Sequence, residues 1–308
     1  MANTSGLQPD NVWQRFTHPV ARDLAWIIAS PALMSNRLKG FTALEFDQDT
    51  KNGCIEWLTH LEHHSPDRLA IDRISFRQLG LYFEALIAFL FSEGWHAGVA
   101  PYRLLGRNIQ VSEGNVTIGE LDMLLEDTQG IQIHLECAVK FYLAHRPQLG
   151  DWRNWVGPNG RDRLDIKLQR LLNHQLTLTK HPAAQQLLTS RGLDAKNISS
   201  RYFLRGMFFP HPESIHYLPM YANPEVLTGR WLHREPFTTH YGENSRLWAG
   251  LPKINWLGGT GINQDQIKNM VDPLPKMLVR NIGGGDIVEH MMLVENYWPD
   301  ISSPSRRI

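Results

Sequence analysis

Three acidic side chains and one lysine occur in two neighbouring segments that otherwise have the residue pattern of β-strands. Glu120 and Asp122 belong to the first segment, and Glu136 and Lys140 belong to the second. Carboxylates and an amine that lie close together can bind a cation, hold a proton or form ion pairs. The elements that position these four side chains therefore decide what chemistry they could do.

The second segment, residues 131–143, has two different faces if it forms a strand, because successive side chains of a strand point to opposite sides. Its odd positions are all apolar, so this face is predicted to be core. Its even positions include Glu136 and Lys140, with the small side chain of Ala138 between them. Either water or chemistry is expected on the even side.

The two segments are joined by the short sequence "DTQG", which predicts an antiparallel pair of strands over residues 116–127 and 131–143. An earlier strand is predicted over residues 102–112. Opposite side chains on one face of an antiparallel pair lie about 5 Å apart. The three acids and Lys140 are therefore expected to form one cluster.

A long helix is predicted over residues 76–95, because the segment is apolar on nearly all sides and Gly94 marks its end. Glu84 is the only acidic or basic residue between Arg77 and Glu93. A buried carboxylate must be paired with a base, protonated or bound to a cation. A structural ion pair and a functional role for Glu84 carry equal weight at this point.

A second helix, predicted over residues 161–179, has leucines on one side and four basic residues on the other. Most basic faces of this kind are simply solvated. The four basic residues are Arg161, Arg163, Lys167 and Arg170.

The loop over residues 144–160 is long, polar and aromatic, which favours a role in contacting substrate. After the helix, a further strand is predicted over residues 200–210.

These elements have the order helix, three strands, helix, strand. In this order, and in "GELDMLL" followed by "HLECAVK", the chain resembles the PD-(D/E)XK phosphodiesterase superfamily. More narrowly, through "YFEALIAFL", "GPNGRDRLDIKL" and "LPKINWL", it resembles an uncharacterised bacterial family of unknown function assigned to that superfamily. The resemblance implies an α/β (α+β) fold with a restriction-endonuclease-like αβββαβ core, in which helices flank a mixed sheet.

Three parts of the chain are predicted on this basis. Residues 1–70 form an N-terminal helical accessory segment, residues 71–210 the nuclease-like core, and residues 211–308 a C-terminal extension of unassigned role. Three histidines in the first part have helical spacing that could hold a metal, but no cysteine or fourth ligand is near, so a solvated face is favoured. These histidines are His60, His63 and His64.

The resemblance also implies an activity, the Mg²⁺- or Mn²⁺-dependent hydrolysis of phosphodiester bonds in DNA, with RNA less favoured. By the same resemblance, Asp122 and Glu136 are the metal ligands, and Lys140 orients the attacking water or stabilises the developing charge. Glu84 would bind the metal through water or hold a second ion, and Glu120 is a reserve ligand. The expected partner is a nucleic acid, with DNA preferred to RNA.

One spacing departs from the superfamily pattern, in which a single residue separates the acid from the lysine. Here the α-carbons of Glu136 and Lys140 would be about 13 Å apart in a regular strand. Either a β-bulge shortens this distance, or Ala138 takes the place of the acid and another carboxylate reaches in. A lost acid would mark a degenerate protein that binds nucleic acid or a protein partner. A third interpretation is a structural ion-pair network on a solvated sheet face.

Composition indicates a globular protein and excludes several classes. The chain has 308 residues, of which 42% are hydrophobic and 20% charged, so a disordered chain is excluded. The formal net charge of +0 argues against coating of nucleic acid through bulk charge, but leaves a local groove open. With only Cys54 and Cys137, neither a disulfide framework nor a cysteine zinc site is expected. No membrane span or secretory signal is apparent, which predicts a cytoplasmic protein without membrane association.

Overall fold

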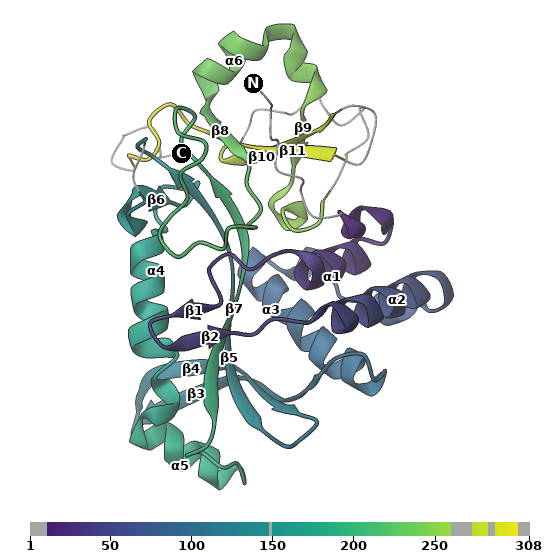
Figure 1. The fold of residues 1–308 in the computed structure, drawn as a ribbon, viewed down its shortest axis with the longest axis vertical. Helices are drawn as coiled ribbons and strands as arrows, with labels where there is room; N and C mark the ends of the chain where they lie inside the picture. Colours follow the sequence, from purple (N-terminus) through teal and green to yellow (C-terminus); the bar gives the residue numbers. More distant parts are fainter. Residues whose placement is uncertain (1–10, 148–149, 260–272, 283–286, 301–308) are drawn as a thin grey trace.

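The computed structural model describes residues 11–147, 150–259, 273–282 and 287–300. Its main sheet has seven strands in the order β1-β2-β7-β5-β4-β3, and β6 pairs with β5. Helices lie on both sides of this sheet (Figure 1). The strands are β1 (Arg37–Leu38), β2 (Phe41–Ala43), β3 (Tyr102–Glu113), β4 (Val116–Asp127), β5 (Gln132–Ala144), β6 (Trp155–Val156) and β7 (Ser199–Phe209).

The main sheet is mixed. Strands β3, β4 and β5 pair antiparallel, whereas β7 runs parallel to both β5 and β2. Short turns join the three antiparallel strands, while the connection from β5 back to the parallel β7 needs a long crossover that contains helices. This architecture confirms the predicted α/β (α+β) fold class, with a mixed sheet flanked by helices.

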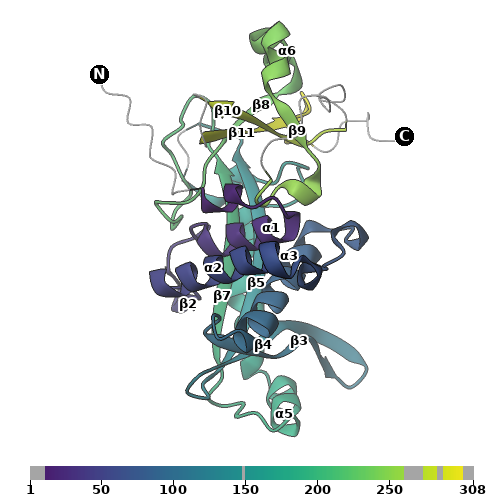
Figure 2. The same cartoon turned by 90° about the vertical axis from the view of Figure 1, so that its right-hand side faces the viewer.

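The two faces of the sheet are covered by different helices (Figures 1 and 2). The apolar odd positions of β5 are buried, as predicted, and helices α1, α2 and α3 pack against them. Helix α4 packs through its leucines against Ala138 and Tyr142 on the other face. The helices are α1 (Pro19–Ala29), α2 (Gln48–His64), α3 (Leu79–Phe89), α4 (Leu164–Arg170) and α5 (Pro182–Ser190).

Both helices next to the centre of the sheet continue into a π turn. Helix α3 continues through Leu90–Gly94, and α4 continues through Leu171–Gln175. A π turn adds a residue to the turn, rotates the side chains that follow it, and is frequent at functional sites. The helices predicted over residues 76–95 and 161–179 therefore exist, but the pitch changes near their C-terminal ends.

The even face of β5 is buried, which contradicts the interpretation of a solvated sheet face. Glu136 is 1% exposed and His134 is fully buried. Lys140, nearer the end of the strand, has a side chain that is 28% exposed. Because β5 keeps one continuous register with β7, no β-bulge brings Glu136 closer to Lys140, and Ala138 lies in regular strand between them.

The C-terminal region forms a second sheet with the strand order β8-β11-β10-β9. Figure 1 shows this sheet, with α6 (Arg234–Tyr241) beside it, at one end of the main sheet. The described residues include no helix that is long and apolar enough to span a membrane. The domain boundaries near residues 70 and 210 stay predictions. The strands are β8 (Arg230–His233), β9 (Ala249–Leu251), β10 (Lys276–Ile282) and β11 (Ile287–Val294).

Candidate functional site

Strands β4 and β5 separate in the middle of the main sheet. They pair only between residues 123–126 and 132–135, although both strands extend well beyond this point. Just past the last pair, the backbone N–H of Cys137 donates to Asp122 Oδ2 at 2.9 Å. A side chain thus replaces the neighbouring strand. Among the described strands, the edge of β5 that follows has no partner until β6 pairs with Leu143 and Ala144.

A cavity of about 530 Å³ lies against this open edge. Residues 137–141 of β5 line it, together with Glu84 from α3 and Lys167 from α4. Lys140 lines it from β5, and Lys253 does so from the C-terminal region. The cavity therefore brings together a helix from each face of the sheet, the open strand edge and the C-terminal region.

Three of the predicted carboxyl groups meet beside this cavity. Burial, followed by the charges of neighbouring carboxylates, raises the pKa of both Glu84 and Asp122 to about 7. Burial raises the pKa of Glu136 to about 7 as well, and a hydrogen bond links its carboxyl to that of Asp122. Like charges that are buried together cannot all ionise unless a cation compensates them. We call Glu84, Asp122 and Glu136 the acid cluster. The positive charge near it is not sufficient to keep all three carboxyls ionised at neutral pH.

Glu136 is held in one orientation by neutral partners. Its Oε1 lies 2.9 Å from His134 Nε2, and its Oε2 accepts a hydrogen bond from Gln175 Nε2. His134 Nδ1 in turn lies 3.1 Å from Ser200 Oγ. Burial lowers the pKa of His134 to about 4, so its ring is neutral at physiological pH. The imidazole and the amide therefore orient the carboxyl without neutralising its charge.

Lys167 is the cation that influences the acid cluster most directly. Its Nζ donates to Gln175 Oε1 at 3.2 Å, and the amide of Gln175 reaches on to Glu136. The charge of Lys167 lowers the pKa of both Asp122 and Glu136. The sequence placed Lys167 on a basic face that was predicted to be solvated, and its three arginines are indeed exposed. Lys167 differs from them because it turns toward the cavity.

Lys140, the lysine of the predicted motif, has a separate partner. Its Nζ donates to Asp162 Oδ2 at 2.5 Å, and the hydroxyl of Tyr142 lies 3.4 Å from Asp162 Oδ1. Asp162 belongs to the loop that precedes α4. Lys140 thus lines the same cavity as Glu84, while its ammonium group is paired with this loop.

Glu120 lies at the exposed rim of the acid cluster. Asn108 on β3 donates from Nδ2 to Glu120 Oε1 at 3.2 Å and also hydrogen-bonds to Glu84, which lowers the pKa of Glu84. Asn108 has φ of +51°, a left-handed conformation in which asparagine is enriched among non-glycine residues. Such backbone conformations cluster at functional positions. No local sequence pattern distinguished Asn108 as a site residue.

The oxygen atoms of the acid cluster suit a hard divalent cation. Mg²⁺ commonly takes one or two protein carboxylates and completes its shell with water and phosphate oxygens, so Asp122 and Glu136 are a sufficient protein set. Within the described ranges, no group of three or more His, Cys, Asp or Glu side chains is placed so that it could hold a metal ion. Because both oxygens of Glu136 have protein partners, a cation there must share an oxygen with Gln175 or His134.

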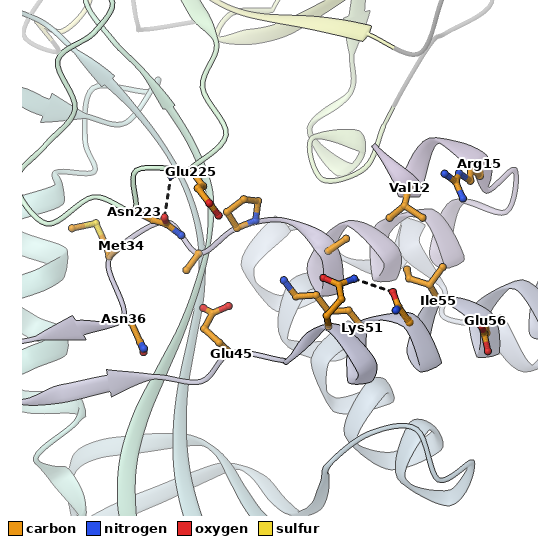
Figure 3. Close-up of a pocket in the computed structure, with 15 residues that line it drawn as sticks. Val12, Arg15, Met34, Asn36, Glu45, Lys51, Ile55, Glu56, Asn223 and Glu225 are labelled. Carbon is orange, nitrogen blue, oxygen red and sulfur yellow. Dashed lines mark hydrogen bonds between the residues drawn. The ribbon is translucent and has the colours of Figure 1, made fainter. Parts of the chain in front are cut away.

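Two other features lie outside the acid cluster. The three histidines of α2 are exposed, as predicted. A larger cavity of about 740 Å³ extends past Glu45 and Lys51 toward Arg15 (Figure 3). There, Glu45 accepts hydrogen bonds from the buried Arg205 at 3.1 and 3.2 Å. Its carboxylate therefore has a guanidinium hydrogen-bonded directly to it, whereas Lys167 acts on the acid cluster through Gln175 and through space.

Comparison with known proteins identifies a family without a named activity. No curated protein and no solved structure matches the chain. The family described as "Domain of unknown function (DUF1853)" matches residues 22–279, a range that includes the whole acid cluster. This match confirms the prediction of an uncharacterised family, and the chain belongs to the DUF1853 family of domains of unknown function.

Proposed function

We propose that this protein is a divalent-metal-dependent phosphodiesterase that hydrolyses DNA, with RNA as the less favoured alternative substrate. The observation that supports this most is the convergence of Glu84, Asp122 and Glu136 at the open edge of β5, each with a pKa raised to about 7. A divalent cation at this point would relieve the repulsion among the three carboxylates. The resemblance to the PD-(D/E)XK superfamily belongs to the same proposal.

In this proposal, each residue of the site has a separate chemical role. Asp122 and Glu136 would hold Mg²⁺ or Mn²⁺, and the bound metal would supply a Lewis acid and lower the pKa of a nearby water. Glu84 would bind the metal through water or hold a second ion, and its carboxylate would accept a proton from the attacking water. An ammonium group of the cavity stabilises the phosphate charge, and the sequence motif assigns this role to Lys140. Glu120 is a reserve ligand at the rim.

Nucleic acid is the proposed partner, and DNA is the preferred one. Because the formal net charge of the chain is +0, attraction of a phosphate backbone has to be local. Lys140, Lys167 and Lys253 supply that local charge around the cavity. The cytoplasmic location predicted from the sequence is the proposed compartment for this reaction.

A cleavage assay tests the proposal directly. Supercoiled, linear, single-stranded and branched DNA are incubated with the protein and Mg²⁺ or Mn²⁺, with EDTA and Asp122→Asn as controls. We expect cleavage of at least one substrate, abolished by both controls. A calorimetric titration with Mn²⁺ accompanies the assay, and the absence of any heat of binding would refute the metal-dependent mechanism.

One observation favours a second function. Ala138 stands where the superfamily pattern has an acid, in a strand without a bulge. A protein that kept the fold but lost this ligand would bind nucleic acid or a protein partner without hydrolysing it. Salt-dependent DNA binding, together with equal inertness of the wild type and Asp122→Asn on every substrate, would select this alternative.

A further inference from the structure

We infer that Lys167, rather than Lys140, is the lysine that contacts the phosphate group of the substrate. This inference rests on the proposed function and deepens it, because it reassigns one role within the same cavity. The resemblance by sequence points to Lys140, so the reassignment depends on the geometry alone. It also gives α4 a part in the chemistry as well as in the packing of the sheet.

The ammonium group of Lys140 already has a charged partner in the protein. It forms a 2.5 Å ion pair with Asp162, and the two side chains are only 28% and 35% exposed. The carbonyl of Asp162 accepts a 2.7 Å hydrogen bond from Gly157 N, which closes the loop before α4. Lys140 therefore attaches this loop to β5, and a phosphate would have to compete with a charged carboxylate for it.

The ammonium group of Lys167 interacts less strongly with the rest of the protein than that of Lys140 does. Its one hydrogen bond among the described residues goes to the neutral amide oxygen of Gln175, and it forms no ion pair there. An ammonium group has three donors, so donors are left for a ligand in the cavity that Lys167 lines. Asp122 and Glu136 act on Lys167 through space, which places its charge beside the proposed metal ligands.

The π turn of α4 explains how Lys167 and Gln175 come to act together. In a regular α-helix, residues seven apart lie on the same face, because seven residues make nearly two turns. Gln175 is eight residues after Lys167, and the extra residue of the π turn at Leu171–Gln175 compensates for the additional step. Gln175 therefore faces the same way as Lys167 and bridges it to Glu136.

The test compares variants by two independent measurements. Lys167→Met removes the charge and keeps the length of the side chain, and Lys167→Arg keeps the charge. Arg170→Met removes a charge from the exposed side of the same helix and is the matched control. The measurements are DNA cleavage with Mg²⁺ and calorimetric affinity for thymidine 3′,5′-bisphosphate with Ca²⁺, and circular dichroism confirms that each variant is folded.

We expect Lys167→Met to lose about 100-fold in cleavage rate, the usual effect of removing one donor to transition-state charge. We also expect it to bind the bisphosphate about tenfold more weakly, while Lys167→Arg recovers part of both losses and Arg170→Met changes neither. Lys140→Met should lose less than Lys167→Met in both measurements, because its effect is to loosen the loop at Asp162.

The outcomes separate this inference from the proposed function. If the wild type cleaves DNA and Lys140→Met loses more activity and affinity than Lys167→Met, the assignment to Lys167 is wrong while the proposed function stands. If the wild type cleaves nothing, the proposed function fails, and the bisphosphate titration still decides the lysine. Unchanged affinity in Lys167→Met, or no binding by the wild type, would overturn the assignment.

Discussion

Two sites with buried carboxyl groups in this protein differ in how the negative charge is balanced. In the first, Asp23 of α1 is 1% exposed and lies 3.0 Å from a guanidinium nitrogen of Arg73. The hydroxyl of Tyr82 donates to it at 2.8 Å, and the backbone N–H of Gly258 donates at 3.2 Å. These interactions of Asp23 join α1, α3 and the C-terminal region, and the positive charge of Arg73 balances the negative charge of Asp23.

The second group is the acid cluster, where carboxylates are each other's neighbours. Burial raises the pKa of Asp23 too, but Arg73 opposes that rise and no other acid adds to it. In the acid cluster, Asp122 and Glu136 add to the effect of burial on Glu84, while the nearest partners of Glu136 are neutral. Burial of an acid alone therefore does not indicate function in this fold. The indication comes from unbalanced charge.

The largest expected effect is the loss of activity in Asp122→Asn. Removal of one of the two proposed metal ligands should lower the proposed metal-dependent cleavage by about 1000-fold or more, within the range of a lost transition-state interaction. The folded protein should be at least as stable as the wild type at pH 8, because one repelling charge is gone. Cleavage assays and thermal denaturation measure the two effects. A large loss of stability would mean that the acid cluster is structural, like the contact at Asp23.

The opposite result is expected for Asp23→Ala. It leaves the guanidinium of Arg73, whose side chain is 15% exposed, without its acid. Breaking a buried pair in this way destabilises a protein by about 3–5 kcal/mol. Urea denaturation measures the change, and cleavage per folded molecule should stay at the wild-type level. If activity falls while stability is kept, Asp23 belongs to the chemistry and the two groups are not distinct in kind.

The central elements of the main sheet could be predicted from hydrophobic periodicity, whereas the second sheet, β8 to β11, was not predicted. The order from α3 through β3, β4 and β5 to α4 and β7 was predicted, with bounds that differ by a few residues, because each element carries its own pattern. The strands β1 and β2 were not predicted, since they are only two and three residues long. The π turns also escaped prediction, because an extra residue in a turn changes no pattern of residue types.

The acids of the candidate site could be predicted in part, and their partners could not. Glu84, Asp122 and Glu136 were identified because an acid in an apolar segment is conspicuous. Gln175 and Asn108 are uncharged residues that become relevant only through tertiary contacts, which a single sequence does not contain. The burial of Glu136 was missed for the same reason, since the cover over the even face of β5 comes from α4.

Mg²⁺ should stabilise the protein in a pH-dependent manner that only the acid cluster can produce. Its carboxyls have pKa values of about 7 when folded, against about 4 when unfolded, so their protonated forms favour folding and this contribution is lost as pH rises from about 4 to about 7. At pH 8, Mg²⁺ at 100 times its Kd should add about 2.7 kcal/mol.

Thermal denaturation at two pH values tests this expectation. At pH 5, Mg²⁺ has to displace protons, so the increase in Tm should be much smaller than at pH 8. Asp122→Asn should show little increase at either pH, whereas Asp23→Ala should respond to Mg²⁺ as the wild type does. An equal increase in all three proteins would place Mg²⁺ elsewhere on the surface.

The smallest effect is expected for Asn108→Gly. This variant tests whether the hydrogen bond from Asn108 lowers the pKa of Glu84 in the acid cluster. Glycine accepts the φ of +51° without strain, so the folding free energy should change by less than about 1 kcal/mol. The loss of the amide removes a hydrogen bond that lowers the pKa of Glu84, and that pKa should rise above about 7.

A higher pKa at Glu84 means stronger competition between protons and the metal. Mn²⁺ affinity of Asn108→Gly, measured by calorimetry, should therefore fall by about threefold at pH 7, since a rise of one full pKa unit, from about 7 to about 8, would lower it by about fivefold. At pH 8.5 Glu84 is ionised in both proteins, and the difference should disappear. An equal deficit at both pH values would show that Asn108 acts by fixing the position of Glu84 and Glu120, because proton competition cannot persist once the carboxyls are ionised.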